Sequence, residues 1–306
     1  MKIVIDGFGG DNAPNAVREA AALAALEYGV EVVITDDSEG VIRVEDDPMT
    51  IRTTAARSSM GKAFAMLKSG EADAMVCAGS TAALMVGGSM VVGRIKGVKR
   101  PALAPIMPSV EGNYILLDGG SNTECRPEML LQFGIMGSIY MNSVMGIKAP
   151  RVGLLNIGTE ENKGRELELE AYKLLKATNL NFIGNVEGRD VPLGACDVVV
   201  TDGFTGNVFL KTVEGMGAFM KHSLRGIFGR NAASKAGYLL AKRGVLEVRR
   251  RTDYREVGGA PLLGTARPVI KAHGSSDALA FKNAIRQAVE FAKSGAISEI
   301  EEALKL

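Results

Sequence analysis

The sequence has no tryptophan, two histidines and three cysteines in 306 residues. Cys77, Cys125 and Cys196 lie far apart and form no Cys-x-x-Cys pair, which argues against a disulfide framework and against a zinc site. A His-Glu-x-x-His metal motif and a Gly-x-Ser-x-Gly nucleophile motif are also missing. No apolar run is long enough to span a bilayer, and the chain begins without a basic and apolar signal segment, so we expect a cytosolic protein.

Net charge and apolar content further restrict the class of protein. Lysine and arginine total 36 and aspartate and glutamate 35, and this net charge of +1 excludes a globally basic nucleic-acid-binding protein. Apolar residues occupy 46% of the positions, enough to bury a large core in one large domain or two smaller ones.

Short apolar runs alternate with segments of helical periodicity. Strands are predicted at 2–6, 30–35, 74–78, 114–118, 151–156, 181–183, 197–201 and 268–272. Helices are predicted at about 14–28, 60–69, 82–93, 127–145, 164–178, 206–228 and 276–293. This order predicts an α/β protein with a mostly parallel, doubly wound sheet.

Three of the apolar runs end in Asp-Gly, at 3–7, 116–120 and 199–203, and each leads into a turn of small polar residues. Any one of them can be an ordinary turn in which Gly supplies unusual backbone angles and Asp caps a helix. Ligands of open α/β sheets bind outside the carboxyl ends of the strands. Several such turns on one edge therefore favour a binding site.

The turn at 7–9 also permits a dinucleotide-binding interpretation, because Gly-x-Gly follows a strand and Asp36 or Asp37 ends the next one. The third glycine of that motif is replaced by Asn12, and Asp11 would place a negative charge near a pyrophosphate. NAD binding is therefore the less favoured interpretation.

The segment His273-Gly274-Ser275-Ser276 is typical of phosphate recognition. It follows the apolar run 268–272 and precedes a helix, so backbone amides and two hydroxyls can converge at a helix N-terminus. One of the serines can cap the helix in either interpretation. His273 is interpreted either as a hydrogen-bonded structural residue or as part of the pocket.

Lys163 and Asn207 follow two further strands. The macrodipole disfavours a cation at a helix start, so Lys163 is either a solvated lysine or faces an anionic substrate or a developing oxyanion. The amide of Asn207 can donate to a carbonyl oxygen. A substrate that is itself the nucleophile, such as inorganic phosphate, needs neither a metal nor a nucleophilic serine.

Seven motifs along the whole chain carry a resemblance to a known family. They are Asp-Gly-Phe-Gly-Gly-Asp-Asn at 6–12, Gly-Arg-Ile-Lys-Gly at 93–97, Arg-Pro-Ala-Leu-Ala-Pro at 100–105, Pro-Arg-Val-Gly-Leu-Leu-Asn-Ile-Gly at 150–158, Asn-Phe-Ile-Gly-Asn-Val-Glu-Gly-Arg-Asp at 181–190, Thr-Asp-Gly-Phe-Thr-Gly-Asn at 201–207 and Ile-Lys-Ala-His-Gly-Ser-Ser-Asp at 270–277. The sequence resembles the bacterial phosphate acyltransferases, which make acyl phosphate from acyl-acyl-carrier-protein and phosphate for phospholipid synthesis.

The resemblance implies a three-layer α/β/α Rossmann-like fold over the single domain 1–306, a homodimer, and no metal or other cofactor. It also implies peripheral attachment to the cytoplasmic membrane. The implied partners are acyl carrier protein, inorganic phosphate and a downstream glycerol-3-phosphate acyltransferase, with no nucleic acid.

The implied reaction is attack of phosphate on the acyl thioester, with electrostatic stabilisation of the tetrahedral oxyanion and expulsion of the carrier-protein thiol. Lys163 and Asn207 are the leading candidates for orienting phosphate or stabilising the oxyanion. The residues expected to line the pocket lie at predicted strand ends and are Asp6, Gly9, Gly10, Asn12, Ser80, Thr81, Asn122, Asn156, Gly158, Asp202, Thr205, Gly206, His273, Ser275 and Ser276.

Two loops depart from the family pattern. Gly-Ser-Thr-Ala-Ala at 79–83 replaces Gly-Asn-Thr-Gly-Ala, and Asp-Gly-Gly-Ser-Asn at 118–122 replaces Asp-Val-Gly-Ala-Asn. Ser80 can still donate a hydrogen bond. The resemblance therefore gives no expectation for the detailed contacts of these two loops.

The segment 216–251 holds nine lysines and arginines against the single acid Glu247, about +8 in charge, with apolar residues at helical spacing. It predicts a helical hairpin that packs on the core or on a second subunit, or that binds an anionic membrane or an acidic carrier protein. The residues expected on that carrier or membrane surface are Lys221, Arg225, Arg230, Lys235, Leu239, Leu240, Lys242, Arg243 and Leu246.

Two other classes of function stay open on these residues. A nicotinamide-dependent dehydrogenase would bind NAD tightly and reduce it. A non-catalytic module would bind a membrane surface or a carrier protein without turnover.

Overall fold

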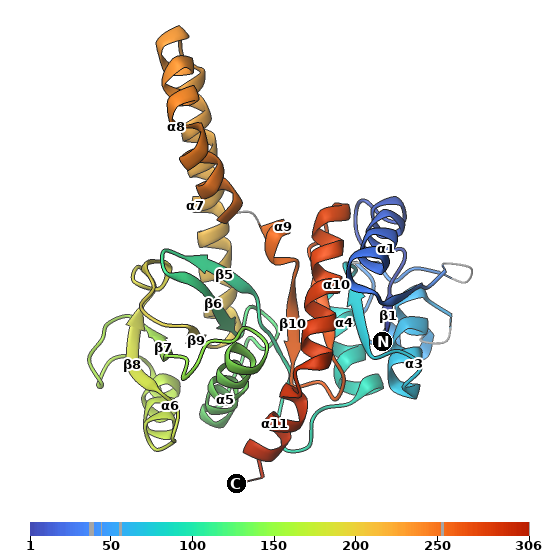
Figure 1. Ribbon diagram of the computed structural model, residues 1–306. Coiled ribbons are helices and arrows are strands. Elements are labelled where there is room, and N and C mark those ends of the chain that lie inside the picture. The colour runs from blue at the N-terminus through green and yellow to red at the C-terminus, as the bar shows by residue number, and fades with distance from the viewer. Residues whose placement is uncertain (37–39, 44, 55–56, 252–253, 306) are drawn as a thin grey trace.

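Figure 1 shows a computed structural model that describes residues 1–36, 40–43, 45–54, 57–251 and 254–305. Asp37, considered above for NAD binding, lies outside these ranges. Two β-sheets flanked by helices lie side by side, and a pair of long helices projects from the body beyond one of them (Figure 1).

The strands, in chain order, are β1 (Lys2–Ile5), β2 (Glu31–Ile34), β3 (Ala74–Cys77), β4 (Ala102–Leu103), β5 (Ile106–Ser109), β6 (Gly112–Leu117), β7 (Val152–Asn156), β8 (Phe182–Glu187), β9 (Val198–Val200), β10 (Gly259–Leu263) and β11 (Val269–Ala272). The helices are α1 (Asn15–Tyr28), α2 (Thr50–Thr54), α3 (Ser59–Ser69), α4 (Thr81–Gly87), η1 (Gly88–Val92), α5 (Pro127–Ser143), α6 (Glu166–Lys176), η2 (Val191–Leu193), α7 (Gly203–Gly229), α8 (Ala232–Arg251), α9 (Tyr254–Val257), α10 (Ala278–Lys293) and α11 (Ala296–Ala303).

The strands form two mostly parallel sheets where the sequence suggested one. The six-stranded sheet has the order β2-β1-β3-β11-β10-β4, and the five-stranded sheet has the order β5-β6-β9-β7-β8. β4 pairs with β10 and β5 pairs with β6, although only Ala104 and Pro105 separate β4 from β5. Pro105 has no N–H to donate, so a continuous hydrogen-bonded strand is interrupted there. The predicted α/β class is confirmed, with its strands divided between two sheets.

Buried apolar strands explain why this sequence folds into layers. Val198, Val199 and Val200 of β9 are fully buried between parallel neighbours, as expected of an uninterrupted apolar run. One contiguous core cluster includes Ile3 of the six-stranded sheet and Leu154 of the five-stranded sheet. The two sheets therefore share a hydrophobic core, and their polar strand ends are held in a fixed relation to each other.

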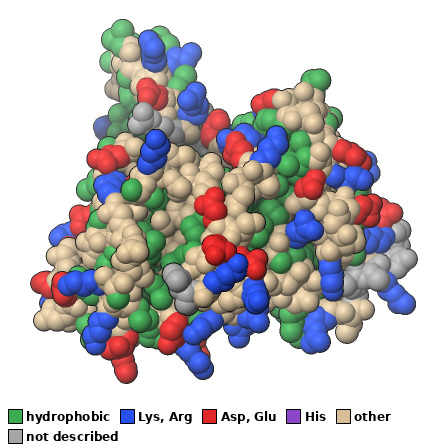
Figure 2. Space-filling model, turned by 60° about the horizontal axis from the view of Figure 1, so that its bottom comes forward, with side chains coloured by type: hydrophobic (Ala, Val, Ile, Leu, Met, Phe, Trp, Pro, Cys, Tyr) green, Lys and Arg blue, Asp and Glu red, His purple; other side chains and the backbone are tan. Residues whose placement is uncertain are grey.

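The projecting helices are α7 and α8, which run in opposite directions (Figure 1). Phe228 and Tyr238 make an edge-on ring contact, with centroids 5.4 Å apart, between the two helices. Basic and hydrophobic side chains lie next to one another on this projection, at the upper left of Figure 2. A Cβ atom added at any of six glycines of this pair would meet nothing within 4 Å; they are Gly215, Gly217, Gly226, Gly229, Gly237 and Gly244.

Candidate functional site

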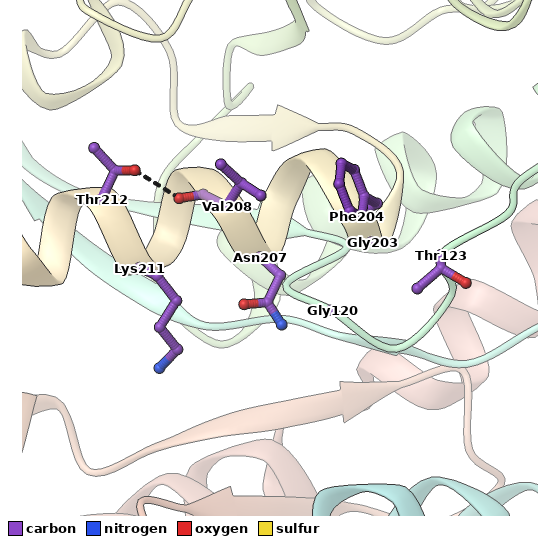
Figure 3. Close-up of a pocket in the computed structure, with 8 residues that line it drawn as sticks. All are labelled: Gly120, Thr123, Gly203, Phe204, Asn207, Val208, Lys211 and Thr212. Atoms are coloured by element: carbon purple, nitrogen blue, oxygen red, sulfur yellow. Dashed lines mark hydrogen bonds between the residues drawn. The ribbon is translucent and has the colours of Figure 1, made fainter.

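A cavity of about 530 Å³ opens at the N-terminal part of α7, where this helix meets the loop after β6. We call it the α7 pocket. Figure 3 shows the side chains of Asn207 and Lys211 pointing from α7 toward strands drawn in the orange-red of the C-terminal part of the chain. The lining residues are Gly120, Thr123, Gly203, Phe204, Asn207, Val208, Lys211 and Thr212.

Asp202 determines where α7 begins. Its carboxylate accepts hydrogen bonds from the backbone N–H and the hydroxyl of Thr205, each at 2.8 Å, and so caps the helix. Burial alone would raise the pKa of Asp202, but hydrogen bonds from Thr205 and Arg165 outweigh it and hold the pKa below its usual value. The charged carboxylate therefore fixes the first turn of the helix that carries Asn207.

Arg165 joins two strand-end loops. Its guanidinium donates to Asp202 at 2.6 Å and also pairs with Glu168, which in turn accepts from the Arg165 backbone N–H at 2.8 Å. The loop after β7 is thereby attached to the N-terminus of α7. Neither Arg165 nor Glu168 was predicted as a site residue.

Asp118 organises the loop that faces Asn207. Its fully buried carboxylate accepts from the backbone N–H groups of Gly120, Ser121 and Asn122, and from the side-chain amide of Asn122 at 2.8 Å. Burial raises the pKa of Asp118, and these hydrogen bonds oppose the rise. The Asn122 amide also donates to the carbonyl of Pro101 at 2.9 Å. Asn122 thus holds the loop together from within.

Glycines allow this loop to approach α7 closely. A Cβ atom at Gly206 would collide with the carbonyl oxygen of Asp118, and one at Gly203 would lie 2.6 Å from the carbonyl oxygen of Asn122. One at Gly120 would lie 2.5 Å from Nδ2 of Asn207. Gly203 and Gly206 are therefore needed for packing, and Gly120 leaves room beside the amide of Asn207.

Lys163 lies in the loop after β7, at the same edge of the five-stranded sheet. Its carbonyl accepts from the side-chain amide of Asn156 at 3.0 Å, and its Nζ lies 4.0 Å from Glu160. Gly158 is buried against the stem of this lysine. Lys163 is exposed and two residues from Arg165, whereas Asn207 lies in the pocket lining.

Asp6, expected in the pocket lining, is buried beneath the loops of the six-stranded sheet. It accepts hydrogen bonds from Ser59 Oγ at 2.6 Å and from Cys77 Sγ at 3.1 Å, and it is 1% exposed. Burial, with the nearby Asp6 carboxylate, raises the pKa of Cys77 well above its usual value. A Cβ atom at Gly9 would lie 2.5 Å from Asp6 and 2.6 Å from the N atom of Gly79. Gly9, which also permitted the dinucleotide-binding interpretation, is therefore explained by the close packing of these loops.

Asn12 ties the first loop to residues 273–276. Its amide donates to the carbonyls of Ser275 and Ser276 at 3.1 and 3.2 Å, and Asp11 N–H donates to the Gly274 carbonyl at 2.8 Å. A Cβ atom at Gly10 would lie 3.0 Å from the same Gly274 carbonyl. These contacts fix the loop after β1 against the loop after β11.

The remaining predicted residues of the six-stranded sheet lie at helix starts. Ser80 is buried and caps α4, which begins at Thr81, by accepting from the backbone N–H of Ala83 at 3.4 Å. Asp277 caps α10 by accepting from Ala280 N–H. Ser276 is fully buried, and its Oγ has no hydrogen-bond partner. A buried hydroxyl without a partner is one candidate to meet a ligand.

Charged residues of α7 influence His273, in the loop after β11. His273 is an exposed residue, but partial desolvation of its ring lowers its pKa, and the Glu214 carboxylate of α7 opposes this effect. Lys211 of α7 lowers the pKa of His273 further, as does Lys271 of β11. The start of α7 and the loop after β11 therefore lie close enough for their charges to interact.

Lys211 is the principal pocket residue that the sequence did not indicate. It lies one helical turn after Asn207, lines the same cavity and pairs with Glu214 at 2.8 Å. The i, i+4 spacing from Asn207 was the available signal. Among the described residues, no group of three or more His, Cys, Asp or Glu side chains could hold a metal ion.

Known proteins match this chain over its length. Residues 30–299 match the family described as "Fatty acid synthesis protein". The phosphate acyltransferase of Caldanaerobacter subterraneus subsp. tengcongensis is 43% identical over 326 residues, covering 100% of this chain and 98% of the relative. That of Bacillus licheniformis is 44% identical over 325 residues, with 100% and 98% coverage. The chain belongs to the phosphate acyltransferase family. As a member of this family it is an acyltransferase of fatty acid synthesis.

Two solved structures show the fold of this phosphate acyltransferase family member. A phosphotransacetylase from Streptococcus pyogenes has a TM-score of 0.62 at 18% identity, covering 95% of this chain and 94% of the other. A branched-chain phosphotransacylase from Enterococcus faecalis has a TM-score of 0.60 at 13% identity, with 96% and 99% coverage. The predicted Rossmann-like α/β fold is confirmed. None of the described helices has both the length and the apolar composition needed to cross a membrane.

Proposed function

We propose that this acyltransferase moves a fatty acyl group from the thioester of acyl-acyl-carrier-protein to inorganic phosphate, giving acyl phosphate and free carrier protein. The observation that carries the proposal is the α7 pocket itself. An amide at Asn207 and an ammonium at Lys211 face it from one helix, and the charge of Lys211 also influences His273 in the loop after β11. Both kinds of donor stabilise oxyanions.

Phosphate supplies the nucleophile in this reaction. An oxygen of phosphate attacks the thioester carbon, an O–C bond forms, and the carbonyl electron pair moves to its oxygen. Collapse of this tetrahedral oxyanion breaks the C–S bond, and the electron pair leaves on sulfur. Because a thiol has a pKa of about 8.5, the thiolate is an acceptable leaving group and takes its proton from water.

Lys163 and Asn207 are proposed to orient phosphate or to stabilise the oxyanion. Asn207 lies in the pocket lining, with the loop at Gly120 beside its amide. The support for Lys163 is indirect: Arg165, two residues away, is paired with Asp202 at the N-terminus of the helix that carries Asn207. Lys211 is added to these two as a third donor toward the same anionic groups.

The exposed surface of α7 and α8 is proposed to meet the carrier protein and the cytoplasmic face of the membrane, in a homodimer. Leu239 and Leu240 are 70% and 91% exposed among basic side chains of this pair. Apolar insertion and charge attraction together favour an anionic surface. The acyl phosphate made there would pass to a downstream glycerol-3-phosphate acyltransferase.

Incubation of the protein with acyl-acyl-carrier-protein and phosphate tests the reaction. We expect acyl phosphate and free carrier thiol in equal amounts, and neither product when phosphate is omitted. Carrier thiol released without phosphate would indicate a thioesterase. Binding of the acyl carrier without any product would instead support the non-catalytic alternative.

A further inference from the structure

Two large hydrophobic side chains line the α7 pocket beside its polar donors. Phe204 and Val208 lie one helical turn apart on α7 and are 64% and 55% exposed, although both are of a kind that usually packs into a core. Ligand pockets are lined largely by hydrophobic and aromatic side chains, with a few polar groups that fix the orientation of the ligand. The composition of the α7 pocket is therefore typical of a site for a ligand that is itself partly apolar.

The helix presents its polar and hydrophobic side chains to the pocket as two neighbouring series. Asn207 and Lys211, four residues apart, form the polar series. Phe204 and Val208 form the hydrophobic series with the same spacing, and Figure 3 shows the two series leaving different sides of α7. Thr212 continues the hydrophobic series, because its hydroxyl donates to the Val208 carbonyl at 2.8 Å and leaves its methyl group for other contacts. One cavity therefore has an apolar margin and a margin of hydrogen-bond donors.

We propose that Phe204 and Val208 bind the fatty acyl chain of the substrate next to its thioester, and that this contact makes the enzyme prefer long acyl chains to short ones. The inference rests on the proposed function and names the part of that site that recognises the chain. Because donors from the polar series hold the oxygens at the reacting carbon, the first methylene groups of the chain must lie close to them. The hydrophobic series lies in the same cavity and removes these methylene groups from water.

Exposed apolar side chains continue along α7 beyond the pocket. Met216 and Met220 are each 54% exposed and follow Thr212 at the same four-residue spacing. Each such step turns about 40° around the helix, so the series winds slowly outward, and the helix advances about 18 Å from Val208 to Met220. This distance is comparable with the length of a long acyl chain, and methionine adapts readily to flexible apolar ligands. The carbons beyond those held by Phe204 therefore have further apolar surface to follow, which favours a long chain over a small apolar group.

Kinetics with two acyl chain lengths test this assignment. We expect Phe204→Ala to lower kcat/KM about ten- to a hundredfold with palmitoyl-acyl-carrier-protein, since small changes in a hydrophobic pocket alter kcat/KM by about this factor. With acetyl-acyl-carrier-protein the same variant should stay within a few-fold of wild type, as should Phe204→Leu with both substrates. Leu193→Ala, at a 63% exposed leucine of η2, is the matched control and should behave as wild type. Equal losses with both substrates would overturn the proposal and indicate a contact with the carrier protein.

A fluorescence measurement tests the position of the chain directly. The sequence has no tryptophan, so Phe204→Trp places a single indole in the α7 pocket. Bromine atoms quench indole fluorescence on contact, and the carboxylate of a fatty acid can take the place of the reacting carbonyl at the polar margin. We expect strong quenching by dibromostearate that carries its bromines near the carboxylate, and weaker quenching by the isomer brominated near the methyl end. Equal quenching by the two isomers, or quenching by neither, would overturn the proposal.

The fluorescence measurement also distinguishes this inference from the reaction itself. If the wild-type protein made no acyl phosphate, the proposed function would be wrong, while position-dependent quenching would still decide whether the α7 pocket binds an acyl chain. Size-exclusion chromatography of Phe204→Ala tests another occupant of the same surface. A variant of lower oligomeric state than the wild-type protein would identify Phe204 as a contact between two copies of this chain, and the assignment to the acyl chain would be wrong.

Discussion

Arg165 donates to the buried carboxylate of Asp202 at 2.6 Å, and this ion pair connects the loop that carries Lys163 with the helix that carries Asn207. The two candidate catalytic residues therefore depend on one contact that touches neither of them. Arg165 is largely exposed, so its removal would leave the buried Asp202 carboxylate with the hydrogen bonds from Thr205 alone. The pair is the natural place to test whether the site is held together as the structure indicates.

Asp202→Asn should change the pH dependence of stability. The folded-state pKa of Asp202 is lowered, so its ionised form stabilises the fold above its ordinary value of 3.8, and this stabilisation is lost as the pH falls through the folded-state pKa. We expect the wild-type free energy of unfolding to fall more steeply than that of Asp202→Asn below about pH 4. Urea unfolding at several pH values measures both slopes, and equal slopes would show that the ion pair contributes nothing.

Lys163→Ala and Asn207→Ala should each lower turnover about a hundredfold while the melting temperature changes little, because each would remove a contact made in the transition state. Lys173→Ala, at an exposed lysine of α6, is the matched control and should keep full activity. Steady-state kinetics and thermal unfolding measure the two effects. Near-wild-type turnover in both variants would remove these residues from the mechanism.

Inorganic phosphate should raise the melting temperature, because a ligand that binds only the folded state stabilises it by mass action. At a hundred times the dissociation constant the stabilisation is about 2.7 kcal/mol. Chloride at matched ionic strength is the control. Melting curves that do not respond to millimolar phosphate would contradict a phosphate site formed by the α7 pocket and the 273–276 loop.

Gly206→Ala should destabilise the protein by about 1–3 kcal/mol, since its methyl group would collide with the Asp118 backbone and displace Asn207. Gly217→Ala, on the same helix with nothing within 4 Å of the added carbon, should instead stabilise α7 by about 0.5–1 kcal/mol. Urea unfolding compares the two variants. Similar effects of the two substitutions would show that Gly206 has no special packing role.

Leu239→Gln combined with Leu240→Gln should release the protein from vesicles of anionic lipid. Each basic residue near such a surface contributes about 1 kcal/mol, and apolar insertion adds about 25 cal/mol per Å² buried. Because both leucines are exposed, we expect the melting temperature to stay unchanged. Leu26→Gln, at an 87% exposed leucine of α1, is the control that should keep binding. A variant that becomes monomeric yet still binds vesicles would identify this surface as a dimer contact.

Local chemistry made part of the architecture predictable. The valines at 198–200 indicated a buried strand, and Asp202 indicated a helix start. Both signals depend only on residues that are close together in the sequence. The division into two sheets could not be foreseen in this way. It depends on which distant strands pair with β4 and β5, and these two-residue and four-residue strands give almost no periodicity.

The sequence predicted which loops lie near the site, but it did not predict most of the contacts that the side chains of these loops make. Asp6 and Asn122 lie at the expected strand ends, but their polar atoms are engaged by Ser59, Cys77 and Pro101. Lys211 escaped notice because a lysine inside an amphipathic helix has the same local pattern whether it faces solvent or a pocket. Only the packing of α7 against the loops decides between the two.

Six glycines of α7 and α8 have open space around the position of a side chain, so no close packing explains their presence. Five of them, all but Gly215, lie in the segment 216–251, and each costs a helix about 1 kcal/mol relative to alanine, or about 5 kcal/mol over this segment. The isolated segment 216–251 therefore has little intrinsic tendency to stay helical. We therefore expect contact with a second subunit, a carrier protein or a lipid surface to stabilise the helices of this segment.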